Sequence, residues 1–124
     1  MNETLQSILD DIRQTYGLVY GIISSSDGSI LVTSGDPREL QWSGLLDALF
    51  GTPESIRRLV GSLTGQLLPR EFAQGETYCF VLKPSDTYLV GLFGQGMLDP
   101  VAQYTNGQKM DQSVQQAFEA KHLC

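Results

Sequence analysis

The side chains of this sequence that could carry chemistry are few and lie far apart. The only histidine, His122, lies in the run KHLC, where Cys124 is the one nearby metal ligand. One histidine at a frayed terminus cannot organise a catalytic triad, and two ligands do not complete a zinc site. We therefore expect no catalytic residue, no bound metal and no cofactor in this chain.

Other polar patterns are more typical of solvated surface than of a reactive site. Asp10 and Asp11 fall on an expected helix, where acidic side chains commonly face water. The glycines of residues 91–96 lack the lysine and hydroxyl residue of a phosphate loop, and they lack the dinucleotide-binding spacing. Arg57 and Arg58 form a basic pair that could meet an acidic partner or a nucleotide phosphate, although surface charges usually have no dedicated partner.

Composition limits the class of protein. The 124 residues are 41% hydrophobic, which suits one domain spanning residues 1–124. The net charge of −6, from 14 acidic and 8 basic residues, repels nucleic acid and anionic membranes. No apolar run is long enough to insert in a membrane, and the N-terminus lacks the features of a signal peptide. We expect a cytoplasmic protein with reduced cysteines and a protein surface as its partner.

The apolar periodicity predicts three helical segments and five strands. Helical spacing begins at Leu5 and is expected to stop at Gly17, and it returns over 38–65 and 97–123. In the middle segment, Gly51-Thr52-Pro53 predicts a kink or break, because proline removes an amide donor. The last segment is expected to be interrupted near Asn106-Gly107. The expected strands are 18–23, 30–33, 70–74, 77–83 and 87–93.

The polarity of these strands predicts their order in one sheet. The runs 18–23 and 88–93 carry no charge, as strands do when both faces are covered, so they belong at the centre. The polar run 70–74 follows a proline and belongs at an edge. Since sequential strands are usually neighbours, the expected order is 2-1-5-4-3. Gly21 and Gly91 would let helices approach the central strands closely.

An apolar stripe on the middle helix predicts a contact surface. Leu45 and Leu49 are expected to face the sheet, whereas Leu46 and Phe50 extend the stripe further than one sheet contact requires. The neighbouring edge strand could pair with the same strand of a second copy, which predicts a homodimer. The expected homodimer or partner interface residues are Trp42, Leu46, Leu49, Phe50, Arg57 and Phe72.

The hairpin of residues 20–31, the helix that follows it and the meander ending at 88–93 resemble the roadblock/LC7 family, of MglB-like bacterial or archaeal type. The resemblance implies an α+β, profilin-like fold with three α/β/α layers and a five-stranded antiparallel sheet. One long helix would cover one face and the terminal helices the other. Family members form homodimers or heterodimers through the second helix and third strand. The MglB-like members act on Ras-like small GTPases as activating or positioning partners, and others are scaffolds or dynein light chains.

The leading hypothesis is therefore a non-enzymatic, dimeric regulator or scaffold that binds a Ras-like small GTPase. Activation and tethering both stay open, as do the GTPase, its nucleotide state and the choice between homodimer and heterodimer. The alternative is a small-ligand sensor module of PAS or GAF type. Such modules enclose a pocket, whereas this sheet carries large side chains that would fill one, namely Tyr20, Tyr78, Phe80 and Phe93.

Overall fold

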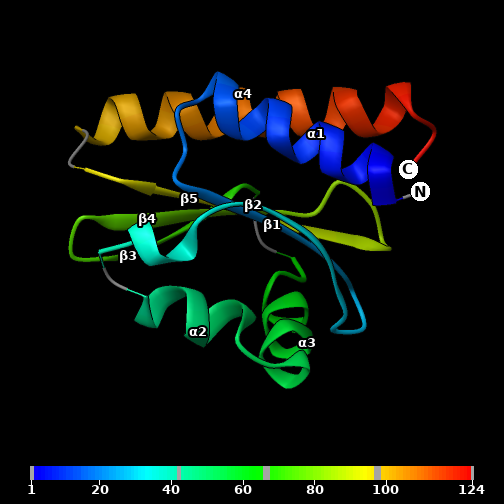
Figure 1. Ribbon diagram of the computed structural model, residues 1–124, viewed down its shortest axis with the longest axis horizontal. Helices are drawn as coiled ribbons and strands as arrows, with labels where there is room; N and C mark the ends of the chain where they lie inside the picture. Colours follow the sequence, from blue (N-terminus) through cyan, green and yellow to red (C-terminus); the bar gives the residue numbers. More distant parts are fainter. Residues whose placement is uncertain (1, 42, 66–67, 97–98, 124) are drawn as a thin grey trace.

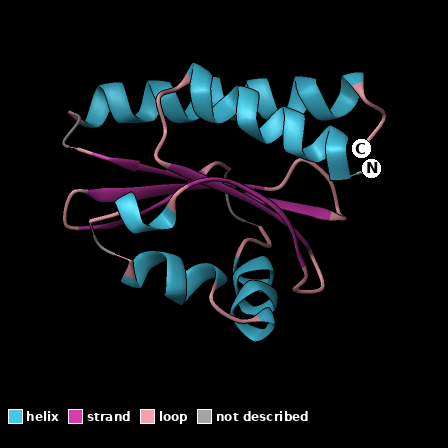
Figure 2. Ribbon diagram, in the orientation of Figure 1, coloured by secondary structure: helices cyan, strands magenta, loops and turns pink. Residues whose placement is uncertain are grey.

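The computed structural model describes residues 2–41, 43–65, 68–96 and 99–123. A five-stranded antiparallel sheet lies between two layers of helices, with α1 and α4 on one face and α2 and α3 on the other (Figures 1 and 2). The helices are α1 (Asn2–Thr15), α2 (Gly44–Phe50), α3 (Pro53–Ser62) and α4 (Pro100–Ala120). The strands are β1 (Tyr20–Ser25), β2 (Ile30–Gly35), β3 (Arg70–Gln74), β4 (Thr77–Leu82) and β5 (Tyr88–Gln95).

The strand order is β2-β1-β5-β4-β3, which confirms the order expected from strand polarity. The two uncharged strands pair at the centre, with Ile22 opposite Gly91. The polar strand β3 lies at the edge, where Phe72 is opposite Cys79 of β4. The hairpin between β1 and β2 turns at Gly28, whose φ of +112° is a conformation that glycine adopts readily. The difference in polarity between the strands, together with the pairing of sequential strands, thus predicted the order of the sheet.

The middle helical segment is broken where the sequence predicted. Helix α2 ends at Phe50, and α3 begins at Pro53 after Thr52, whose Oγ1 accepts a hydrogen bond of 3.0 Å from the Ser55 amide. The single long helix that the resemblance implied is therefore two helices here. The segment also begins later than expected, because residues 37–39 form only a short 3-10 turn.

The expected interruption near Asn106-Gly107 is wrong. Helix α4 runs continuously from Pro100 to Ala120. A Cβ at Gly107 would lie 2.8 Å from Cε1 of Phe80, so the glycine lets the helix approach the sheet. Glycine costs about 1 kcal/mol relative to alanine inside a helix, and packing against the sheet can offset that cost.

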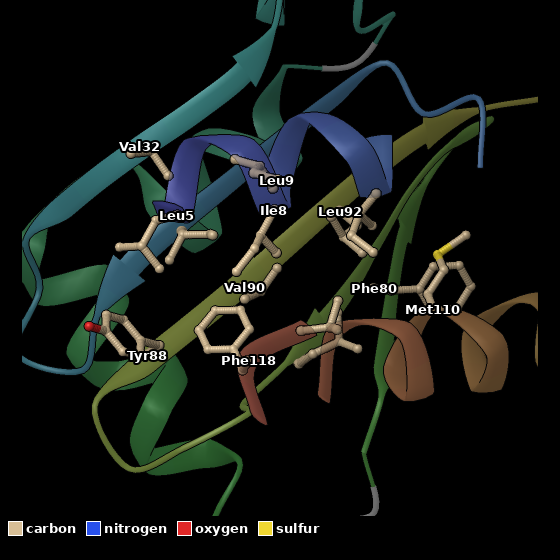
Figure 3. Packing of buried hydrophobic residues seen from close by; sticks show 14 of the residues in the cluster. Leu5, Ile8, Leu9, Val32, Phe80, Tyr88, Val90, Leu92, Met110 and Phe118 are labelled. Atoms are coloured by element: carbon tan, nitrogen blue, oxygen red, sulfur yellow. The ribbon is translucent and has the colours of Figure 1, made fainter. Parts of the chain in front are cut away.

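Two hydrophobic clusters fill the space on either side of the sheet. We call them the α1/α4 core and the α2/α3 core. In the α1/α4 core, the rings of Tyr88 and Phe118 meet edge to face, and Leu5 and Leu9 descend onto the sheet from α1 (Figure 3). The α2/α3 core contains Phe50, Ile56, Leu59 and Phe93, among others.

The two central glycines have the packing role expected from the sequence. A Cβ at Gly21 would lie 2.8 Å from Cδ1 of Leu9 on α1. On the opposite face, a Cβ at Gly91 would lie 2.5 Å from Cε2 of Phe50 on α2. Both distances are shorter than a normal carbon contact, so the absence of a side chain lets each helix approach its central strand.

Candidate functional site

The open edge of the sheet, strand β3, is the candidate partner surface. Among the described strands, β3 pairs only with β4, so the backbone groups on its outer side have no strand partner. Phe72 packs against the α2/α3 core, and the Arg70 guanidinium carbon lies 4.9 Å from the centre of its ring. Because side chains alternate along a strand, Glu71 and Ala73 lie on the α4 side. Such an edge can receive a strand from another chain.

Helix α2 lies over β3 and β4, beside this edge. A Cβ at Gly44 would lie only 3.0 Å from Oε1 of Gln74, at the end of β3. Leu46 is half-buried against the α2/α3 core, whereas Asp47 and Ala48 are exposed. The edge strand and the outer side of α2 are therefore neighbouring surfaces that one partner can contact together.

Two of the predicted interface residues occupy positions that fit such a contact. Leu46 of α2 and Phe72 of β3 are each half-buried, and both pack at the margin of the α2/α3 core. Trp42 lies outside the described residues, so its expected role stays a prediction. The sequence therefore identified apolar groups on both neighbouring elements.

The expectation that Phe50 widens an exposed rim is wrong. Phe50 is 2% exposed, and Leu49 is 9% exposed, so both belong to the α2/α3 core of the subunit. The Phe50 ring covers Gly91 and meets the Phe93 ring at a centroid distance of 6.0 Å in an edge-to-face arrangement. The break after Phe50 explains the difference, because a helix that ends there can turn its last residue into the sheet.

The basic pair on α3 has unequal surroundings. Both Arg57 and Arg58 are exposed, and Nη1 of Arg57 donates a hydrogen bond of 3.0 Å to the Asp27 carbonyl in the β1–β2 hairpin. The pKa of the Asp27 carboxyl is lowered, chiefly by the hydrogen bond from Ser25, and the Arg57 charge contributes least. Arg57 thus connects α3 to the hairpin.

The acidic pair on α1 also has a structural role. Oγ of Ser34 donates a hydrogen bond of 2.5 Å to Asp10, and Nε of Arg13 donates one of 2.7 Å to the Ser34 oxygen. These contacts tie α1 to β2, while Asp11 is exposed. Within the described residues, no group of three histidine, cysteine or acidic side chains could hold a metal ion.

The glycine-rich end of β5 fits packing rather than phosphate binding. Residues 88–95 form a strand, so the glycines before residue 96 are part of the sheet. A Cβ at Gly94 would lie 2.3 Å from Cζ of Tyr78, which leaves no room for a side chain there. The Tyr78 ring therefore covers this glycine on the β4 side.

A second surface feature is a groove of about 400 Å³ between the β3–β4 hairpin and the first half of α4. Tyr78 and Phe80 of β4 line its floor, and Glu71 and Tyr104 lie on its two sides. Burial raises the pKa of the Tyr78 hydroxyl, and the neighbouring Glu71 charge raises it further. Sequence reasoning missed this groove. The available signal was Tyr104, an aromatic residue on a largely polar helix segment.

Comparisons with known proteins identify the fold. MglC from Myxococcus xanthus aligns with a TM-score of 0.66 at 14% identity, over 95% of this chain and 98% of that chain. MglB from Myxococcus xanthus aligns with a TM-score of 0.63 at 6% identity, over 96% and 90%. The gliding protein MglB from Thermus thermophilus gives 0.57 at 15% identity, over 95% and 90%. No protein-family model and no curated protein matches the sequence.

The chain therefore has the roadblock/LC7 fold, in the form that MglB-like proteins share. The match extends over nearly the whole chain and includes all three layers, which confirms the expected fold. Another similar structure is an MglB with a tetrameric arrangement, which aligns with a TM-score of 0.59 at 10% identity over 95% of this chain and 89% of that chain. Among the described residues, no helix has the length and apolar content needed to cross a membrane.

Proposed function

We propose that this protein is a non-catalytic, dimeric regulator or scaffold that binds a Ras-like small GTPase. The observation that carries the proposal is the MglB-like fold together with an open β3 edge beside α2. The family resemblance implies association through these two elements and action on a small GTPase. The tetrameric arrangement of one similar MglB supports self-association as a property of this fold.

The proposed dimer joins the β3 edges of two subunits. Antiparallel pairing of the two edges would extend the sheet across both copies, and Leu46 and Phe72 would become fully buried beside the seam. Both side chains are already half-buried, so each has apolar surface left to cover. Arg70, held over the Phe72 ring, would shield the margin of this contact.

Any effect on GTP hydrolysis is proposed to come from ordering the switch loops of the GTPase, which is a shift in population rather than supplied chemistry. The side chain of Arg57 is engaged with the hairpin carbonyl. An arginine that enters the site of phosphoryl transfer would have to leave such a contact. Arg58 is the more accessible candidate for an arginine finger.

The alternative of a small-ligand sensor has less support. Sensor modules of this layered kind hold their ligand between the sheet and a helix. Here Leu92 and Phe93 of the central strand β5 are buried in the cores on its two sides, and Phe118 of α4 is buried beside Leu92 in the α1/α4 core. The groove of about 400 Å³ lies between α4 and the β3–β4 hairpin, at the margin of the sheet and not over its buried centre.

The first prediction tests the dimer and its consequence together. The double variant Leu46→Glu/Phe72→Glu should convert a dimer to a folded monomer, because two carboxylates would be buried at the seam. Light scattering after size-exclusion chromatography measures the mass, and circular dichroism checks the fold. The control is Ile30→Glu, which places one such carboxylate at a residue 51% exposed on the opposite edge strand.

The same samples are then titrated with the Ras-like GTPase encoded nearest to this chain, loaded with GTP or GDP. The native protein and the Ile30→Glu control should bind one nucleotide state more tightly, and the monomeric variant should bind less. A monomeric native protein would refute the dimer, and the absence of binding in both states would refute the GTPase partner. In single-turnover hydrolysis, Arg57→Ala/Arg58→Ala should keep most of the stimulation. A loss of about a thousandfold with binding retained would instead show an arginine finger.

A further inference from the structure

The groove beside α4 is formed by two separate parts of the fold, one of which makes its floor and the other its wall. The floor is the face of β3 and β4 that α1 and α4 leave partly uncovered, with Tyr78 and Phe80 as its apolar surface. The wall is the first half of α4, which lies above the same end of the sheet as the β3–β4 hairpin (Figure 1). This face is opposite α2 and α3, so the groove includes β3 of the proposed dimer seam but not the contact surface on α2.

The charged side chains that line this groove are both carboxylates, which accept hydrogen bonds. Glu71 and Glu76 line it, and the groove has no lysine or arginine among its lining residues in the described part of the chain. The ion pairs found among the described residues join Arg38 to Asp36 and Lys83 to Asp86, so they leave both glutamates unpaired.

A third acceptor strengthens the case for a donor-rich occupant. Gln103 lines the groove from α4, and its Oε1 is shielded from solvent without a hydrogen-bond partner among the described residues. A shielded amide oxygen without a donor costs free energy, which an incoming N–H group would recover. Two carboxylates and one amide oxygen thus call for the same kind of ligand, one that carries positive charge and several N–H donors.

Apolar surface continues past the groove along α4. Tyr104 and Val101 are 70% and 74% exposed and lie three residues apart, so they occupy one face of the helix. They are two of the three large apolar side chains found exposed in the described residues, the third being Ile30 on β2. An aromatic and an aliphatic group beside an acidic groove offer anchoring points for a chain longer than one small amine.

We propose that the groove between β3, β4 and the first half of α4 binds a peptide segment of a partner protein in which arginine or lysine alternates with apolar side chains. The cationic groups donate to Glu71, Glu76 and the amide oxygen of Gln103. The apolar groups pack on Tyr78 and Tyr104. The volume of the groove, about 400 Å³, falls within the range of about 300–1,000 Å³ that is typical of ligand sites.

Charge argues against other occupants. A nucleotide, a nucleic acid or an anionic membrane would bring negative charge to the two glutamates of the groove. A second copy of this chain carries a net charge of −6, so it is a poor source of the required cations. The proposal does not depend on the GTPase or on dimerisation, because all of its residues belong to one subunit.

The test begins with a random heptapeptide library displayed on phage and selected on the immobilised full chain. Peptides are counter-selected on Glu71→Gln/Glu76→Gln, a variant that keeps the size of both side chains and removes their charge. Enriched peptides should combine arginine or lysine with aromatic or aliphatic residues. Enrichment of acidic peptides, or of no common pattern, would overturn the proposal.

The most enriched peptide is then titrated into the ¹⁵N-labelled full chain. Its binding should shift the amide signals of residues 70–80 and 101–108, and Glu71→Gln/Glu76→Gln should weaken binding about fivefold or more, which is about 1 kcal/mol. The matched control Glu39→Gln/Glu54→Gln removes two exposed charges outside the groove and should leave the affinity unchanged. Equal weakening in both variants, or shifts confined to other residues, would show general attraction to an acidic surface and refute the site.

Discussion

The centre of the sheet and its β3 edge are built in opposite ways. Strand β5 is buried from Tyr88 to Gly94, and α2 approaches it so closely that only glycine fits at residue 91. Strand β3 pairs on one side and has no fully buried residue. The centre therefore supplies the packing that holds the subunit together, whereas the edge can change its side chains at small cost to folding. We assign the proposed partner contact to the edge for that reason.

The largest effect should come from removing the aromatic ring that covers the centre. Phe50→Ala leaves a cavity over Gly91 and beside Phe93, and it should lower the free energy of unfolding by about 3–5 kcal/mol. Phe72→Ala at the edge should cost about 1 kcal/mol, because that ring is only half-buried. Urea unfolding followed by circular dichroism at one protein concentration measures both values.

Equal losses in the two phenylalanine variants would erase the distinction between centre and edge. Phe50, expected from the sequence to be an interface residue, is therefore unsuitable for testing the dimer. A charged residue at that position should unfold the subunit before it reports on any dimer, since the side chain is 2% exposed.

A smaller effect is expected from adding one methyl group at the centre. Gly91→Ala forces the Phe50 ring away from a Cβ that would otherwise lie 2.5 Å from it, which should cost about 1–3 kcal/mol. The matched control is Gly61→Ala on α3, where a Cβ has no neighbour within 4 Å. That substitution should stabilise by about 0.5–1 kcal/mol through helix propensity. A neutral Gly91→Ala would mean that α2 can move off the sheet freely.

The sequence predicted features that depend on nearby residues. Pro53 after Thr52 is a local signal for a helix start, and the break occurs there. The composition of each strand likewise indicated whether it lies at the centre or at the edge, and the order in the sheet followed from that. The role of the two central glycines could be predicted, because glycine inside a strand often marks a place where another segment packs closely.

Features that depend on the meeting of distant segments were not predictable. An apolar stripe at helical spacing does not say how wide its buried part is, so Phe50 was expected at a rim and lies in the core. Gly107 was expected to interrupt the helix, because the neighbouring sequence does not show that this glycine packs against Phe80 of β4. The groove requires Glu71 and Tyr104 to meet across 33 positions of sequence (104 minus 71), and no local pattern carries that information.

The smallest predicted effect concerns the boundary between centre and edge. Cys79 of β4 is buried directly opposite Phe72 of the edge strand, and burial raises the pKa of its thiol far above the ordinary value. In the unfolded chain the thiol ionises near its usual pKa of about 8.5, whereas the folded protein keeps the proton. The unfolded state therefore binds fewer protons at alkaline pH, and the stability of the folded state falls as pH rises above that value.

Between about pH 7 and about pH 9, this ionisation should lower the free energy of unfolding by about 1 kcal/mol. The matched variant Cys79→Ala loses some packing at every pH but should lose that part of the pH dependence. Urea unfolding of both proteins at the two pH values separates the terms. If the two proteins respond to pH alike, water reaches the thiol through β3. Strand β4 would then be accessible to solvent like the edge strand β3, and the boundary between buried centre and accessible edge would lie between β4 and β5.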